Sequence, residues 1–230
     1  FDLSFNKIGS VEKLQKGKIN VVDNFKNPPE ISYGSLNKEI GAAAFESIKT
    51  GVKDLNDGKI DVLVTPPINK EAIHSNEFQF MGHTDYIDSK IDGEATMMMV
   101  SDSLKVALLT EHIPISEVSK SITKELVVNK IKKLNKTLMR DFQIEKPKIA
   151  ILSIDPHAGD GGVISENDKK TMFPSVKELQ KSGVLAYGPF SADSFFGSME
   201  YTKYDLIVAS YHDQGLIPFK TLSFGNGVNY

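Results

Sequence analysis

The stretch KPKIAILSIDPHAGDGG, Lys146–Gly162, carries the pattern on which the predicted fold class rests. It begins with a nearly continuous apolar run, breaks at Pro156 and passes through His157 into a glycine-rich turn. A short apolar run bounded by turn residues is typical of a strand buried on both faces, as strands of parallel sheets are. His157 therefore follows directly on a predicted strand, where open α/β sheets bind their ligands.

The same pattern recurs on both sides of this stretch. Residues 104–138 predict a strand, a turn and a helix, and residues 204–215 predict a strand and a turn. Between them, residues 166–183 predict a helix with Pro174 as a candidate break. Continuous apolar strands that alternate with helices predict an α/β fold, with a mostly parallel sheet covered by helices on both faces.

The first third of the chain predicts a long helix in residues 34–58. Its apolar residues recur at helical spacing: Ile40, Ala44, Ile48, Val52 and Leu55. Gly58 is a suitable stop. The segment Ile60–Val64 then predicts a short buried strand, followed by a Pro-Pro turn and a helix start.

Composition excludes several classes of protein. The net charge of −3 and the pI near 6.0 give no basic face for nucleic acid. No apolar run approaches the roughly 18 residues of a membrane span, and no signal-peptide pattern opens the chain. Cysteine is absent, which fits the reducing cytoplasm. We expect a cytoplasmic protein that binds neither membrane nor nucleic acid.

Three of the five histidines follow predicted buried strands: His112, His157 and His212. Ligands bind beyond the carboxyl ends of parallel strands, so these side chains are expected at one edge of the sheet. Three imidazoles suit a catalytic metal such as zinc or another divalent ion, with one position left for water or substrate. A single histidine in such a place more often bonds to loop backbone, and His74 is expected to be structural or exposed.

Two further turns carry polar side chains. In Gly82-His83-Thr84, a permissive backbone, an imidazole and a hydroxyl suit a phosphate or carboxylate, although an ordinary polar turn has the same composition. Lys220 and Asn229 bracket a glycine turn, where a lysine is either a phosphate partner or simply solvated. No G-x-G-x-x-G follows a strand, and neither a Walker A motif nor a G-x-S-x-G elbow is present.

Six motifs occur together in a familiar order: PINKEAI, GHTDY, TEHIPISEV, DPHAGDGG, GPFSADSFF and YHDQGLIPFK with FGNGVN. In this order the chain resembles the 4-hydroxythreonine-4-phosphate dehydrogenases of pyridoxal 5'-phosphate (vitamin B6) biosynthesis, from about Leu36 to Asn229. The resemblance implies a three-layer α/β/α fold of the isocitrate/isopropylmalate dehydrogenase type, with a mixed sheet, two lobes and an active-site cleft between them. It also implies a homodimer.

The resemblance sets expected lobe limits. Residues 1–81 would form part of the first lobe, residues 82–215 the second lobe with the histidines, and residues 216–230 would return toward the first. The family's early glycine-rich turn is expected before Phe1, and its late arginine after Tyr230.

The resemblance also implies site residues. The histidines of its three strand-end motifs bind one divalent metal (Zn, Mg, Mn or Co) at the dimer interface, and they match His112, His157 and His212. Its substrate-binding residues match His83, Thr84, Lys220 and Asn229.

The implied reaction oxidises the C3 hydroxyl of 4-phosphooxy-L-threonine with NAD⁺. The product, a 2-amino-3-oxo acid, decarboxylates to 3-amino-2-oxopropyl phosphate. A base must take the hydroxyl proton, and Lys70 and Asp213 are the candidates. Asp213 is alternatively a support for a metal-binding histidine. No pattern indicates which residues contact NAD.

Three acidic residues depart from the family motifs: Asp85, Asp155 and Asp160. They bear on the choice of substrate and leave open a dehydrogenase of another 4-phosphorylated hydroxy acid, such as erythronate or threonate 4-phosphate. A non-redox metal-dependent hydrolase or transferase is a second alternative. A catalytically inactive metal-binding or ligand-binding protein is a third.

Overall fold

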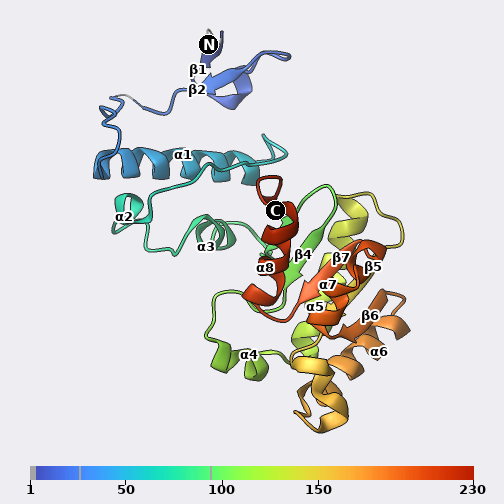
Figure 1. Ribbon diagram of the computed structural model, residues 1–230. Coiled ribbons are helices and arrows are strands. Elements are labelled where there is room, and N and C mark those ends of the chain that lie inside the picture. The colour runs from blue at the N-terminus through green and yellow to red at the C-terminus, as the bar shows by residue number, and fades with distance from the viewer. Residues whose placement is uncertain (1–3, 26, 94) are drawn as a thin grey trace. The chain divides into compact units, whose positions relative to one another are not determined.

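The computed structural model describes residues 4–25, 27–93 and 95–230, and its chain forms two compact units, Phe1–Ala95 and Thr96–Tyr230 (Figure 1). The predicted lobe limits, 1–81, 82–215 and 216–230, stay a prediction. Among the described residues, none of the helices has the length and apolar character needed to cross a membrane.

In its described residues, the first unit holds a small parallel sheet and three α-helices. Strands β1 (Asn6–Ile8) and β2 (Asn20–Val22) flank a single 3-10 turn, η1 (Val11–Lys13). The predicted long helix is confirmed as α1 (Lys38–Asn56), and α2 (Lys70–Ile73) and α3 (His83–Asp88) follow it. Asparagine side chains cap α1 and α2 by accepting hydrogen bonds from the first free N–H groups.

Aromatic packing forms the core of this unit. The buried stripe of α1 places Phe45 against Phe78 and Tyr86, with ring centroids 5.2 and 5.3 Å apart in edge-to-face arrangements. Ile48, Val52 and Ile73 complete the cluster.

The predicted buried strand Ile60–Val64 is wrong. This segment forms no strand, and Val62 and Val64 are 72% and 86% exposed. An apolar run becomes a strand only where a neighbouring strand accepts its backbone hydrogen bonds, and none of the described residues pairs with this segment.

The second unit is built on a six-stranded mixed sheet in the order β6-β5-β7-β4-β3-β8. Its strands are β3 (Met98–Val100), β4 (Lys105–Leu108), β5 (Lys148–Leu152), β6 (Leu185–Phe190), β7 (Leu206–Ala209) and β8 (Val228–Asn229). Strands β6, β5, β7 and β4 run parallel, whereas β3 is antiparallel to both β4 and β8. The predicted mixed α/β sheet is confirmed.

Helices cover both faces of this sheet (Figure 1). Ile149 and Ile151 of β5 pack with α5 (Lys124–Arg140) and α6 (Phe173–Lys181), which begins where a wide turn, η3 (Asp168–Met172), ends. Ala150 and Leu152 face the opposite side, with α7 (Ala192–Gly197) and α8 (His212–Ser223). The remaining short elements are α4 (Ile115–Ser121), η2 (Pro156–Gly162) and η4 (Glu200–Lys203).

Candidate functional site

The carboxyl ends of β4, β7 and β5 meet at one edge of the sheet because these neighbours run parallel. His112 follows β4, His157 follows β5, and His212 begins α8 directly after β7. Gly215 lets α8 approach the sheet closely, since a Cβ there would lie 2.8 Å from Leu108 Cδ2 and 2.9 Å from Ala209 Cβ. The start of α8 is thereby held against β4 and β7.

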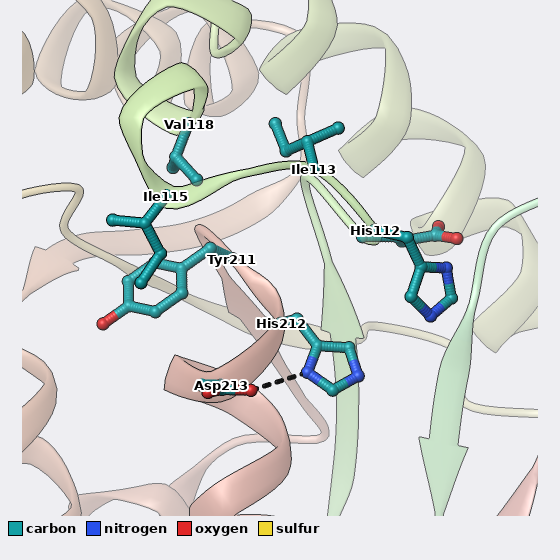
Figure 2. A pocket seen from close by; sticks show the side chains of 8 residues that line it. His112, Ile113, Ile115, Val118, Tyr211, His212 and Asp213 are labelled. Carbon is teal, nitrogen blue, oxygen red and sulfur yellow. Dashed lines mark hydrogen bonds and ion pairs between the residues drawn. The ribbon is translucent and has the colours of Figure 1, made fainter.

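Two of the three histidines share a pocket between the β4–α4 and β7–α8 turns, as Figure 2 shows. The ring centroids of His112 and His212 lie 5.6 Å apart. The residues that line the pocket are of two kinds. Glu111, His112, His212 and Asp213 are polar or charged, and Ile113, Ile115, Val118 and Tyr211 are mainly apolar.

Asp213 orients the His212 ring. Its Oδ1 lies 2.8 Å from His212 Nδ1, the contact drawn as a dashed line in Figure 2. In the tautomer with the proton on Nδ1, this nitrogen donates to the carboxylate, and the lone pair of Nε2 is left for a ligand. The carboxylate predicted as a candidate base therefore bonds to a predicted metal ligand.

A buried lysine anchors the turn that carries His112. Lys130, on α5, is 9% exposed, and its Nζ lies 3.3 Å from both Leu109 O and Glu111 Oε1. Met97 N–H donates to the same Glu111 oxygen at 3.3 Å. These contacts tie the residue next to His112 to a helix and to the neighbouring strand segment.

The third histidine lies on a left-handed turn. His157, Ala158 and Asp160 all have positive φ, at 54°, 52° and 45°, although none is a glycine. Gly159, at φ 77°, allows close approach, because a Cβ there would lie 2.5 Å from the carbonyl oxygen of Ser165. The turn leaves the His157 side chain exposed.

His157 does not line the pocket of the other two histidines. Hydrogen bonds from Ser191 and the Ser194 backbone N–H hold the pKa of Asp193 below its usual range, and the nearby charge of His157 lowers this pKa further. Asp193 lies on α7, so this interaction is outside the His112–His212 pocket.

Two acidic side chains brace the backbone before His157. Asp168 is fully buried, and its carboxylate accepts the N–H groups of Ile154 and Asp155 at 2.9 and 3.0 Å. Burial raises the pKa of Asp168, against the lowering effect of these two bonds. Asp155 in turn accepts hydrogen bonds from Ser165 Oγ and Asn167 Nδ2.

The histidines fit a metal ion only in part. With Zn–N distances of about 2.0–2.1 Å, each ring centroid lies roughly 3 Å from the ion, so rings as close as His112 and His212 can share one. No group of three or more His, Cys, Asp or Glu side chains suited to a metal occurs within the part of the chain that the structure describes. One chain therefore supplies two of the three predicted ligands together.

Lys220 and Asn229 lie farther along the second unit. Lys220 is exposed near the end of α8, and Asn229 lies exposed in the edge strand β8, in register with Met99. Neither lines the His112–His212 pocket. Their predicted roles in substrate binding stay predictions.

Lys70, His83 and Thr84 belong to the first unit, where each begins a helix or its first turn. Lys70 and Thr84 are exposed. Among the described residues, His83 Nε2 is buried without a hydrogen-bond partner, and burial lowers the pKa of this histidine. A buried, unpaired imidazole nitrogen suits a residue that awaits a ligand.

Sequence reasoning missed three residues around the histidines: Glu111, Tyr211 and Lys130. Glu111 and Tyr211 immediately precede His112 and His212 and line their pocket. Their position beside strand-end histidines could have indicated this. The sequence gives no sign of Lys130, because its role depends on how α5 packs.

The mixed sheet, with polar side chains at the carboxyl ends of its parallel strands, defines an α/β protein whose candidate site lies where this class usually binds its ligands. The family model described as "Pyridoxal phosphate biosynthetic protein PdxA" matches residues 1–230. The chain belongs to the PdxA family.

Individual relatives agree with this assignment. A 4-hydroxythreonine-4-phosphate dehydrogenase of Bacteroides thetaiotaomicron is 39% identical over 99% of the chain, and the chain spans 63% of that relative. A protein of Oceanobacillus iheyensis, named as a candidate D-threonate 4-phosphate dehydrogenase, is 34% identical over 99% of the chain and 70% of its own length. Among solved structures, the crystal structure of a 4-hydroxythreonine-4-phosphate dehydrogenase from Burkholderia phymatum is similar, with a TM-score of 0.82 and 32% sequence identity. The match covers 99% of the present chain and 71% of the Burkholderia chain.

Proposed function

We propose that the protein is a dehydrogenase that oxidises 4-phosphooxy-L-threonine at its C3 hydroxyl with NAD⁺ and a divalent metal. In the balanced reaction, a base takes the hydroxyl proton and hydride passes from C3 to NAD⁺. The resulting 2-amino-3-oxo acid then loses CO₂, takes up a proton at C2 and gives 3-amino-2-oxopropyl phosphate. The observation that carries the proposal is the His112–His212 pair at the sheet edge, in a chain of the PdxA family.

A bound divalent ion would supply Lewis-acid stabilisation of negative charge on the substrate oxygen. His112 and His212 would hold it through ring nitrogens, which suit Zn, Mn or Co better than Mg. Within the described residues the structure brings His112 and His212 together without a third ligand, so we infer that His157 of the partner subunit completes the site in a homodimer.

The contact of Asp213 with His212 supports different roles for the two candidate bases. Asp213 is engaged with His212 Nδ1, which suits a residue that orients a metal ligand. Lys70 is then the proposed base. His83, Thr84, Lys220 and Asn229 are proposed to hold the charged ends of the substrate, in a site between two lobes of the isocitrate/isopropylmalate dehydrogenase type.

The test is NADH formation from NAD⁺ and 4-phosphooxy-L-threonine by the full-length protein, before and after chelation and metal restoration. We expect turnover that stops with the chelator and returns with the metal. Lys70→Ala should lose turnover and regain part of it with added primary amines. Turnover that needs no NAD⁺ would point instead to a metal-dependent hydrolase or transferase.

A second candidate substrate is D-threonate 4-phosphate, which the name of the Oceanobacillus relative suggests. Two motif departures bear on the choice. Asp85 accepts the Met81 N–H at 3.1 Å, and Asp155 bonds to Ser165 and Asn167, so both carboxylates are engaged by their own turns. These bonds do not separate the two substrates. A panel of both substrates and erythronate 4-phosphate, ranked by kcat/KM, decides between them.

A further inference from the structure

A buried polar layer lies at the carboxyl ends of the three histidine-bearing strands. It consists of Thr110, Ser153 and Ser210, which are 7%, 1% and 0% exposed. Each precedes one of the three histidines along the chain. Buried hydroxyl and backbone groups in such a layer need partners, so the bonds they make fix how the strand ends lie relative to one another.

Hydroxyl groups join the strands pairwise. Thr110 Oγ1 donates to Ser210 O at 2.8 Å and links the end of β4 to that of β7. Ser210 Oγ lies 3.3 Å from Leu152 O and 3.2 Å from Ser153 O and links β7 to β5. The layer therefore runs across all three strands.

One side-chain amide adds a connection from the helix. Gln214 lies on the first turn of α8, after His212 and Asp213. Its Oε1 accepts the Ser210 N–H at 2.7 Å, and its Nε2 donates to Ser153 O at 2.8 Å. The amide thus bonds to the backbone just before His212 and to the backbone that leads into the His157 turn.

We propose that Gln214 is a positioning residue that sets the His212 turn relative to the His157 turn. The inference rests on the proposed function, because each of the two turns carries a proposed metal ligand: His212 for one site of the dimer and His157 for the site of the partner subunit. A glutamine is suited to the task, since one group must accept from an N–H and donate to a carbonyl. Glutamate offers only acceptors when ionised, and asparagine is one methylene shorter.

The chain offers a matched control. Gln180, on α6, also donates from Nε2 to a backbone carbonyl, Ala186 O, at 2.8 Å. Gln180→Glu therefore removes the same kind of bond as Gln214→Glu, away from the histidines. Both variants are compared with wild type by thermal unfolding, so that a general loss of stability is measured separately from a change at the site.

NMR signals of the histidine side chains report on the surroundings of the rings in the two turns, and the measurement needs no metal. Selective ¹⁵N-imidazole labelling of the full-length protein reports on the five histidines of this chain. In Gln214→Glu we expect the His212 and His157 signals to shift and those of His74 and His83 to stay. Gln180→Glu should move none of them. Unchanged His212 and His157 signals in Gln214→Glu would overturn the proposal.

Metal affinity gives the second readout. Loss of a group that supports a metal ligand typically weakens metal binding about 10- to 100-fold, so Co²⁺ titration of Gln214→Glu should show roughly that loss and Gln180→Glu none. Equal Co²⁺ affinity of Gln214→Glu and wild type would count against the role. A wild type that binds no Co²⁺ would refute the proposed function, while the histidine spectra would still decide on Gln214. If Gln214→Glu does not fold, Gln214→Asn takes its place in both measurements.

Discussion

The three turns at one edge of the sheet place their histidines in different surroundings. The turns after β4 and β7 bring His112 and His212 into one pocket, with ring centroids 5.6 Å apart. The turn after β5 instead runs through left-handed backbone, and His157 does not line this pocket. The end of a parallel strand decides at which edge a residue lies, whereas the backbone of the turn decides which neighbours its side chain meets.

The largest expected effect tests whether the paired histidines hold the metal. His212→Ala should weaken Co²⁺ or Zn²⁺ binding by more than about 100-fold, since loss of a supporting group alone costs about 10- to 100-fold. Isothermal titration of the two ions measures it. His74→Ala is the control, because His74 is exposed and lies outside the pocket. Equal metal affinity in both variants would show that the pair is not the metal site.

Dimers formed from two different variants test whether His157 completes the metal site of the partner subunit. If His157 serves the site of the partner subunit, co-expressed His157→Ala and His212→Ala chains form hybrid dimers with one intact site each. Random pairing then restores about a quarter of wild-type turnover, although each variant alone is inactive. Mixing His112→Ala with His212→Ala should restore nothing, because these two ligands come from one chain. Recovery in the control mixture alone would contradict the shared site.

The free energy of unfolding of glycine variants tests the constraint on the left-handed turn after β5. Gly159→Ala should lower the free energy of unfolding by about 3 kcal/mol, because left-handed φ costs about 1–2 kcal/mol and the new Cβ would also overlap Ser165 O. Gly161→Ala should cost only about 1 kcal/mol, since its φ is also positive but a Cβ there meets nothing within 4 Å. Urea unfolding of both variants gives the difference. Equal losses would show that the contact with Ser165 does not constrain the turn.

Part of this arrangement could be predicted from the sequence. Apolar runs followed by His112, His157 and His212 indicated parallel strands with histidines at one edge, and the strand pairing has this form. The glycines of DPHAGDGG indicated a turn after β5. They did not indicate that His157, Ala158 and other non-glycine residues would share the left-handed backbone.

Long-range packing explains what the sequence could not show. The segment Ile60–Val64 is mostly apolar, as β5 and β7 are, but its composition does not say whether a neighbouring strand is present. The contact of Lys130 with Glu111 depends on where α5 packs against β4, which side-chain spacing along the helix does not reveal. In both cases the deciding partner is distant in the sequence.

A smaller effect is expected where Asp213 orients the ring of His212. Asp213→Asn should weaken metal binding about tenfold, at the lower end of the range for groups that orient a metal ligand. Asparagine keeps the shape but loses the charge that favours a proton on His212 Nδ1. Co²⁺ titration measures the change, and Asp160→Asn, an exposed carboxylate on the turn of His157, is the control. A loss as large as that of His212→Ala would mean that Asp213 itself binds the metal.

The smallest effect compares the backbones under His157 and His112. A residue at φ 54° is strained unless it is glycine, so His157→Gly should be more stable to unfolding than His157→Ala by about 1 kcal/mol. His112 is not among the residues with positive φ, so there the order should reverse, with His112→Gly less stable than His112→Ala by roughly half a kcal/mol. Urea unfolding of the four metal-free variants measures both differences. Opposite signs would show that the backbone of its turn holds His157 in place at a cost in stability, a cost that selection for folding alone would remove. The same sign at both positions would instead mean that the turn relaxes out of the left-handed region, and the contrast between the two turns would then lie in their side chains.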